Sequence, residues 1–175
     1  MDGKIEGGTT STSATEPEVL AERTPTLRRT LRGLSDAMLA ALMRALETHA
    51  HELVPGRLFR SRDGSGCAVG LMLRELAPER YESPSALRFW LRDRWRRRAS
   101  SYPELARNPR LRHLEWLFDS SVKELRAGRP DPSGSFPHTV GQWILREARL
   151  ELDWRSIRTG IHRSGSSAEV AGVAI

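Results

Sequence analysis

Residues 34 to 53 read Leu-Ser-Asp-Ala-Met-Leu-Ala-Ala-Leu-Met-Arg-Ala-Leu-Glu-Thr-His-Ala-His-Glu-Leu, and this stretch decides the fold. Its apolar residues recur every three or four positions, which places them on one face of a helix: Leu39, Leu42, Met43, Leu46, Ala50 and Leu53. Ser35 is a preferred N-cap residue, and Leu34 and Leu39 occupy the two positions of a hydrophobic staple. Pro55-Gly56 ends the run. The pattern predicts an amphipathic helix that begins after Ser35 and reaches residue 53.

Three segments further along the chain open with residues that start helices. Ser83-Pro84 and Asn108-Pro109 each place a capping residue before a proline at the first helical position. A periodic apolar run follows the second pair, and Gly128 and Pro130 favour a helix end there. Residues 139 to 142, Thr-Val-Gly-Gln, form a capping box ahead of an apolar run that starts at Trp143. Each segment predicts a helix.

The remaining local signals are shorter. Leu27, Leu31 and Leu34 indicate a short helix that is broken at Gly33. Loops are expected over residues 57 to 66 and 127 to 137. Residues 149 to 155 alternate polar and apolar side chains, which is typical of a strand, but the sequence shows no partner strand.

These signals predict an all-α fold, a small helical bundle of four to six helices with disordered N- and C-terminal tails. Residues 1 to 24 combine glycines, a Thr/Ser run and scattered acids with little apolar surface, so we expect a disordered acidic and polar tail. Residues 160 to 175 are expected to form a flexible tail. Residues 25 to 159 then make a single helical domain, which is long enough to bury a core.

Composition points to a soluble cytoplasmic protein. The chain has 175 residues and one cysteine, Cys67, which excludes an internal disulfide framework and fits a reducing compartment. No basic segment followed by an apolar stretch opens the sequence, so no secretory signal is expected. The longest apolar runs fall far short of the roughly 20 residues that span a bilayer, and no membrane insertion is expected.

The stretch with the strongest functional character is residues 88 to 98, which read Arg-Phe-Trp-Leu-Arg-Asp-Arg-Trp-Arg-Arg-Arg. Six arginines against one aspartate give a local charge of +5 in eleven residues. Guanidinium groups pair with phosphates and carboxylates, and indoles stack on bases or anchor a partner surface. The stretch therefore suggests a helix that binds nucleic acid or a protein partner through Arg88, Arg92, Arg94, Trp95, Arg96, Arg97 and Arg98.

Overall charge does not identify the ligand. Of the 28 basic residues only Lys4 and Lys123 are lysine, which leaves 26 arginines, and a bias of this kind is typical of a GC-rich genome. Residues 1 to 24 carry five acids and two basic residues, a net charge of −3, so the rest carries +9 to reach the stated +6. A basic body of this kind is compatible with nucleic acid, an anionic membrane surface or an acidic protein.

The arginine stretch also has a purely structural interpretation. Cations in the last turn of a helix complement its dipole, and their aliphatic stems cover the edge of a core. A nucleic-acid interface needs further phosphate contacts, and six arginines in neighbouring segments can supply them: Arg57, Arg60, Arg62, Arg107, Arg110 and Arg112. No helix-turn-helix, zinc-finger or RNA-binding sheet signature accompanies these residues.

Residues 63 to 70, Asp-Gly-Ser-Gly-Cys-Ala-Val-Gly, offer a second candidate site. Gly64 and Gly66 allow backbone amides to turn inward, so that with Cys67 they form an anion nest at the start of a helix. The segment lacks the Gly-Lys-Ser/Thr ending of phosphate loops, and a flexible turn before a buried helix explains it equally. Cys67 is either a nucleophile or redox sensor with a lowered pKa, or a small core residue.

The sequence predicts neither a metal site nor a cofactor. His49 and His51 are two residues apart, so on a helix they point in nearly opposite directions. Together with Cys67 they match no closed four-ligand zinc pattern.

Two function hypotheses follow. The first is a small non-enzymatic regulatory or accessory protein that binds a polyanion, foremost nucleic acid, through the arginine stretch. The second is a protein-interaction module that docks on an acidic partner, because tryptophan and arginine are also enriched in interface hot spots. An enzyme or redox sensor that uses Cys67 ranks third.

Overall fold

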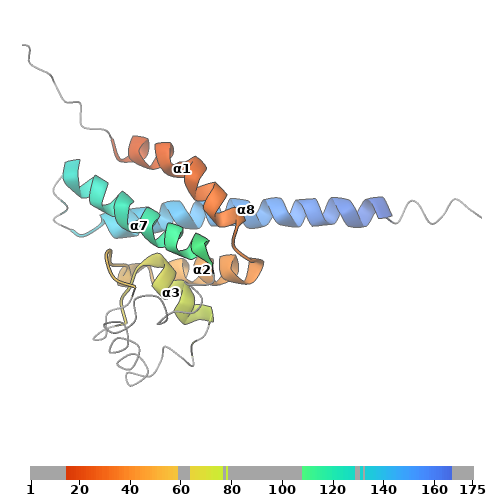
Figure 1. Cartoon of the computed structure of the whole chain (residues 1–175), viewed down its shortest axis with the longest axis horizontal. Helices are drawn as coiled ribbons and strands as arrows, with labels where there is room; N and C mark the ends of the chain where they lie inside the picture. The colour runs from red at the N-terminus through yellow and green to blue at the C-terminus, as the bar shows by residue number, and fades with distance from the viewer. Residues whose placement is uncertain are drawn as a thin grey trace, which may run out of the picture.

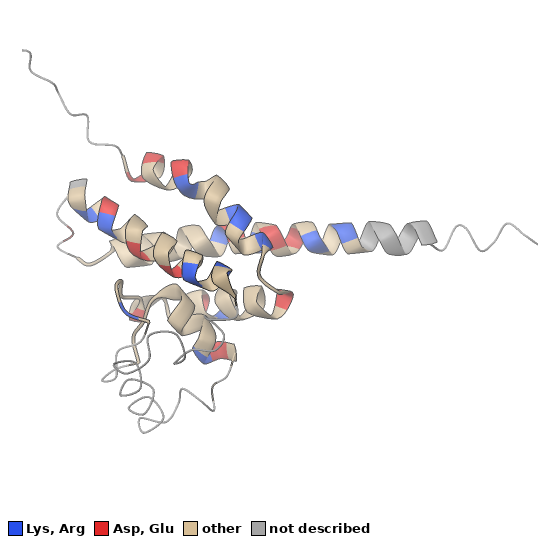
Figure 2. Cartoon of the chain, in the orientation of Figure 1, with Lys and Arg blue, Asp and Glu red and all other residues tan. Residues whose placement is uncertain are grey.

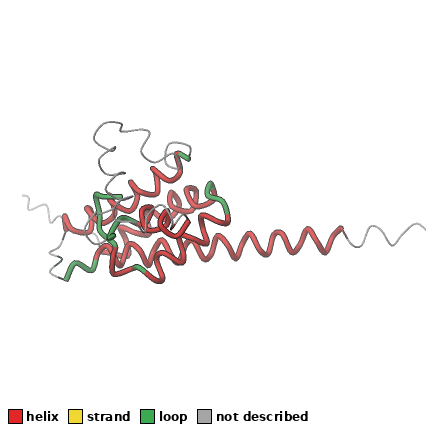
Figure 3. The backbone as a smooth tube through the Cα atoms, turned by 90° about the horizontal axis from the view of Figure 1, so that it is seen from below, coloured by secondary structure: helices red, strands yellow, loops and turns green. Residues whose placement is uncertain are grey.

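The computed structural model describes residues 15–58, 64–76, 78, 108–128, 131 and 133–166. Within these ranges the chain forms five α-helices and one short 3-10 helix (Figure 1): α1 (Glu16–Arg32), α2 (Asp36–Thr48), η1 (Ala50–Glu52), α3 (Ala68–Leu76), α7 (Pro109–Gly128) and α8 (Phe136–Ser166). The extended pairing among the described residues is one isolated bridge between Leu53 and Gly66. In Figure 3 the described residues are drawn as helix or loop, with no strand among them. The predicted all-α bundle is confirmed.

The helical domain begins earlier in the sequence than the predicted boundary at residue 25. Helix α1 begins at Glu16, where the backbone amide of Thr15 donates to Glu18 Oε2 at 2.6 Å, so residues 16 to 24 are helical and not a disordered tail. Val19 and Leu20 are buried. Pro25 lies inside α1, although a proline usually marks the edge of a helix. The predicted break at Gly33 is confirmed, since α1 ends at the residue before it.

Helix α2 starts as predicted and ends earlier. The side chain of Ser35 accepts a hydrogen bond from the amide of Met38 at 3.2 Å, which confirms the N-cap. The α-helix stops at Thr48, and the 3-10 turn η1 replaces the expected continuation to residue 53. Leu53 remains buried, because the turn directs the chain toward Gly66.

The predicted ends of α7 are confirmed. The helix begins at Pro109, with Asn108 Oδ1 accepting from the amide of Arg110 at 3.0 Å, and it ends at Gly128.

Helix α8 differs from its prediction at the start, in the middle and at the end. It begins at Phe136, because the carboxylate of Asp131 accepts from the amides of Ser135 (2.7 Å) and Phe136 (3.1 Å), so Thr139 is no N-cap. Residues 149 to 155 are helical, which rules out the strand interpretation. The helix then continues to Ser166, beyond the tail boundary expected at residue 160.

The core lies where α8 crosses the other helices. Helix α2 packs against α3 and α8, and α1 packs against α7 and α8. The largest fully buried side chains include Phe118, Leu42 and Leu71. Gly141 permits a close approach of α8 to η1, because an added Cβ would lie 2.5 Å from Leu53 Cδ1. The C-terminal half of α8 projects past the bundle (Figure 1).

Candidate interaction surfaces

Most of the predicted ligand-binding arginines lie outside the described residues. These are Arg60, Arg62, Arg88, Arg92, Arg94, Arg96, Arg97, Arg98 and Arg107, together with Trp95. Arg57, Arg110 and Arg112 are described, and their side chains are exposed. The polyanion-binding interpretation of the arginine stretch therefore stays a prediction.

The backbone around Gly64 does not form the predicted anion nest. Gly64 has the expected positive φ of 72°, but its carbonyl oxygen accepts from Arg74 at 3.3 Å. The amide of Gly66 donates to the carbonyl of Glu52 at 3.1 Å, and the amide of Cys67 donates to the carbonyl of Arg57 at 2.9 Å. These two bonds tie the loop to Glu52 at the end of η1 and to Arg57 after it, so the two amides are not directed at a bound anion.

Cys67 is a core residue. Its side chain is fully buried, and burial raises the pKa of the thiol from its ordinary value of 9.0 to about 12. A thiol of this pKa is protonated at neutral pH, whereas a reactive cysteine needs the thiolate. The nucleophile and redox-sensor hypotheses therefore lose their chemical basis.

His49 belongs to a cluster of charged side chains between η1 and α3. Its Nδ1 lies 2.9 Å from Glu52 Oε1, and its Nε2 lies 3.3 Å from Glu75 Oε1. Burial raises the pKa of Glu52, but the hydrogen bond and charge of Arg74 outweigh it, with a smaller effect of His49, so the pKa lies below its usual value. Among the described residues no group of three His, Cys, Asp or Glu side chains is placed to hold a metal ion.

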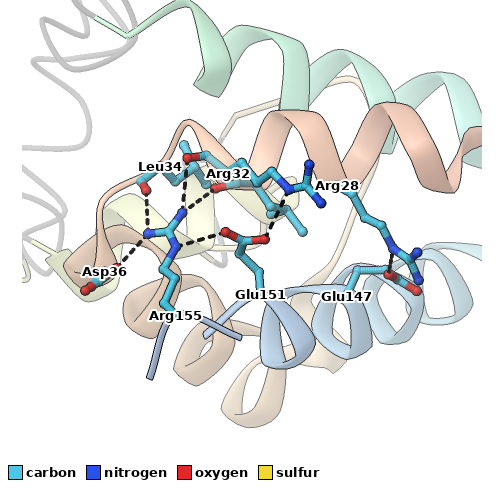
Figure 4. A network of polar contacts seen from close by, with 8 residues as sticks. Arg28, Arg32, Leu34, Asp36, Glu147, Glu151 and Arg155 are labelled. Atoms are coloured by element: carbon cyan, nitrogen blue, oxygen red, sulfur yellow. Dashed lines mark hydrogen bonds and ion pairs between the residues drawn. The ribbon is translucent and has the colours of Figure 1, made fainter. Parts of the chain in front are cut away.

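Two buried glutamates of α8 are paired with arginines of α1 (Figure 4). Glu147 and Glu151 are 2% and 9% exposed. Arg28 Nε lies 2.7 Å from Glu147, and Arg32 Nε lies 3.6 Å from Glu151. Carboxylates buried to this degree need charged partners, so these pairs fix how α8 lies on α1.

Arg155 joins α8 to the end of α1 and the start of α2 (Figure 4). Its guanidinium donates to the carbonyl oxygens of Leu31, Arg32 and Leu34 at 3.0 to 3.4 Å. It also donates to Asp36 at 2.6 Å and to Glu151 at 2.9 Å. Burial alone lowers the pKa of Arg155, but the bonds to these two carboxylates raise it above its usual value. The guanidinium thus supplies a donor to carbonyl groups at and just after the end of α1, although the carbonyl of Leu31 also accepts from the amide of Leu34 at 2.9 Å.

Four large apolar side chains of the described structure remain exposed, and they form two surfaces. Trp116 on α7 is 58% exposed, and Leu150, Trp154 and Ile157 on α8 are 51%, 50% and 62% exposed. No functional role is predicted for any of these four residues from the sequence. Aromatic side chains held in solvent are frequent anchors of protein interfaces.

Neighbouring side chains hold Trp116 in place. The guanidinium of Arg23 on α1 lies 5.9 Å from the centre of the indole, and the ring of His113 meets it edge-on at 5.6 Å. Arg23 is itself anchored by a hydrogen bond to Ser120 at 2.6 Å and by an ion pair with Glu124.

Two basic residues share the outer face of α7 with Trp116. Arg112 and Lys123 lie four residues before and seven residues after the tryptophan, which places all three on one side of the helix. Both basic side chains are exposed, and neither forms an ion pair with another described residue. We call Arg112, Trp116 and Lys123 the Trp116 face. Elsewhere charges of both signs are spread along the helices (Figure 2).

The second surface lies on α8, where this helix leaves the bundle. Leu150, Trp154 and Ile157 are spaced by four and three residues, so they form one stripe along the helix, which we call the α8 stripe. The guanidinium of Arg158 lies 5.2 Å from the centre of the Trp154 indole. An open groove lined by Gln142, Leu145, Arg146, Arg149 and Leu150 adjoins the stripe.

Comparison with known protein families, curated proteins and solved structures found no match to this chain. In the part of the chain that the structure describes, no helix is both long enough and apolar enough to cross a membrane.

Proposed function

We propose that this protein is a non-enzymatic interaction module that docks on an acidic protein surface through the Trp116 face. The observation that carries the proposal is the 58% exposure of an indole that contacts two side chains, Arg23 and His113. A side chain that is already oriented loses less conformational freedom on binding. Trp116 therefore has the properties of a preformed anchor.

Charge around Trp116 favours an acidic partner. Arg112 and Lys123 are exposed on the same face without an ion pair to a described residue. The acids of α7 are engaged within the chain: Glu124 pairs with Arg23, Asp119 accepts from the amide of Gly56 at 2.9 Å, and Glu115 also has a partner. The charge left to a ligand is positive, and complementary potentials steer partners and fix their register.

The nucleic-acid hypothesis depends on residues 88 to 98, which lie outside the described residues. In the described bundle many arginines are paired with carboxylates, among them Arg28, Arg32, Arg74, Arg149 and Arg155. The described surface therefore offers no broad basic face that supports this hypothesis, and it becomes one outcome of the test below.

Trp116→Ala is expected to weaken capture of the partner by at least roughly 30-fold, because hot-spot residues contribute about 2 kcal/mol or more. The tagged protein is used to capture partners from an extract of the cells that express it, with and without nuclease. Bound proteins are identified by mass spectrometry, and the affinity of the purified partner is measured for each variant. Arg112→Glu should also weaken binding and should reduce its dependence on salt.

Trp154→Ala is the matched control, since it removes an equally exposed indole from another helix and should leave this affinity unchanged. The proposal fails if Trp116→Ala binds as tightly as the original chain, or if the captured partner has no acidic surface. Capture that nuclease abolishes would favour the nucleic-acid hypothesis instead. In that case labelled duplex DNA and single-stranded RNA should bind the chain with an affinity that falls steeply with salt.

A further inference from the structure

The α8 stripe continues a repeat that already packs the core. Positions spaced alternately by four and three residues run along one seam of α8: Phe136, Val140, Trp143, Glu147, Leu150, Trp154 and Ile157. The first four are buried in the bundle, with exposures of 7% or less, whereas the last three are exposed by half or more. This alternation is the heptad repeat with which helices pack against each other. The seam is therefore buried up to Glu147 and exposed from Leu150 to Ile157. Helix α8 itself runs on past the bundle (Figure 1).

We infer that the α8 stripe is covered by the same stripe of a second copy of this chain, in a parallel pair of α8 helices. This inference is independent of the Trp116 face, which lies on a different helix. In heptad notation Leu150 and Ile157 occupy d positions and Trp154 occupies an a position. The sequence places Ile161 at the next a position.

Charges beside the stripe favour a second copy in parallel orientation. In a parallel pair, the residue at a g position faces the residue five positions later, at e, in the other helix. Asp153 is at g and Arg158 is at e, so each Asp153 would face an Arg158 of the second copy. Neither residue forms an ion pair with another described residue. An antiparallel pair brings g positions together, which would place Asp153 near another Asp153.

The next pair along the seam, Arg146 at g and Glu151 at e, also has opposite charges but contributes little. Glu151 is only 9% exposed and lies on the bundle side of α8. Both residues also have partners within the chain, because Arg146 lies 3.2 Å from Glu147 and Glu151 binds Arg155. The pair of Asp153 and Arg158 therefore contributes more to the choice of partner.

The paired region starts at Leu150, because the bundle covers the earlier positions of the seam up to Glu147. Before Leu150 the two α8 helices must diverge. Ile144, Ala148 and Leu152 form the face of α8 that packs on the bundle. At about 100° per residue this face is centred roughly 160° around the helix from Leu150. Beside Leu150 the bundle therefore lies on the far side of α8 from the stripe, which leaves the stripe open to a second copy. Because the exposed seam is short, we expect a weak dimer with a dissociation constant on the order of micromolar.

The test is sedimentation velocity of the full chain over a roughly hundredfold range of concentration, because association follows mass action. The wild-type protein should shift from monomer to dimer as the concentration rises. The variants Trp154→Glu and Ile157→Glu should each stay monomeric with an unchanged helical circular dichroism spectrum. Trp116→Ala is the control and should dimerise normally. A chain that is monomeric throughout, or a dimer that survives both glutamate variants, would overturn the inference.

Charge reversal tests the pairing itself. Asp153→Arg and Arg158→Asp alone should each weaken the dimer by roughly tenfold, because each places like charges in contact, while an equal mixture of the two variants should restore it. Ile157→Cys should form a disulfide-linked dimer on mild oxidation, since equivalent d positions meet only in a parallel pair. Failure of the mixture to restore association, or absence of the disulfide, would contradict the parallel arrangement.

Discussion

Replacing Arg155 with alanine is expected to lower the free energy of unfolding by about 3 kcal/mol. The guanidinium is the shared partner of the carboxylates of Asp36 and Glu151 and of three carbonyl oxygens at the end of α1 (Figure 4). Without it, the buried Glu151 keeps only Arg32 at 3.6 Å, and the carbonyl groups of Arg32 and Leu34 lose the guanidinium as a donor, whereas that of Leu31 keeps the amide of Leu34 at 2.9 Å. Leaving buried polar groups unpaired is the main source of this cost.

Urea denaturation followed by circular dichroism measures the effect. The matched control is Arg158→Ala, which removes the same side chain one turn further along α8, where it contacts the exposed Trp154. This variant should change stability by less than about 1 kcal/mol. Equal denaturation midpoints for the two variants would show that Arg155 does not hold α8 to α1 and α2.

Above pH 9 the stability of the protein is expected to fall because of Cys67. In the folded chain burial raises the pKa of this thiol to about 12 from its ordinary value of 9.0. The unfolded chain therefore loses the thiol proton at a lower pH than the folded chain does. The protonated thiol makes its full contribution to the free energy of unfolding below pH 9, and this contribution decreases as the pH rises to 12. Each pH unit in this window costs about 1.4 kcal/mol, so the total loss approaches about 4 kcal/mol.

Cys67→Ala isolates this titration from other groups that ionise at high pH. The measurement is the free energy of unfolding of both chains at several values between pH 8 and pH 12, the window that the raised pKa defines. The difference between the two chains should shrink steadily and then change sign, because the alanine variant has no thiol to deprotonate. Parallel curves for the two chains would contradict the burial of Cys67.

Helix ends were predictable where the capping group lies next to the helix. Ser35 and Asn108 bind amides within three residues of themselves, so both starts could be read from short segments. The start of α8 was missed because its cap, Asp131, lies five residues before Phe136, across a turn. The first half of α1 was missed because it has only two buried apolar residues, Val19 and Leu20. Their burial depends on helices distant in sequence.

Buried ion pairs explain the false strand signal over residues 149 to 155. Glu151 and Arg155 lie on the packed side of α8, where a helical pattern would place apolar residues. Their partners on α1 and α2 cannot be inferred from local spacing. The alternation of polar and apolar residues therefore favoured a strand over a helix.

The two interaction surfaces were only partly accessible from the sequence. Periodicity places Trp116 on a helix, whereas Trp154 lies in the stretch whose alternation favours a strand. Neither pattern tells which apolar residues stay uncovered after the helices pack. One signal was present for α8: the alternation of four and three residues from Phe136 to Ile157 runs longer than the bundle can cover.

Hydroxyl-radical footprinting of the tryptophans tests the central claim most directly, because it reads the exposure of each side chain by itself. The protein is labelled alone and with its purified partner at one fixed concentration, and oxidation is compared at Trp116 and Trp154, which are 58% and 50% exposed in the single chain. Docking through the Trp116 face predicts that the partner protects Trp116 strongly and leaves the oxidation of Trp154 unchanged. Equal oxidation of Trp116 in the free protein and in the complex would contradict the account.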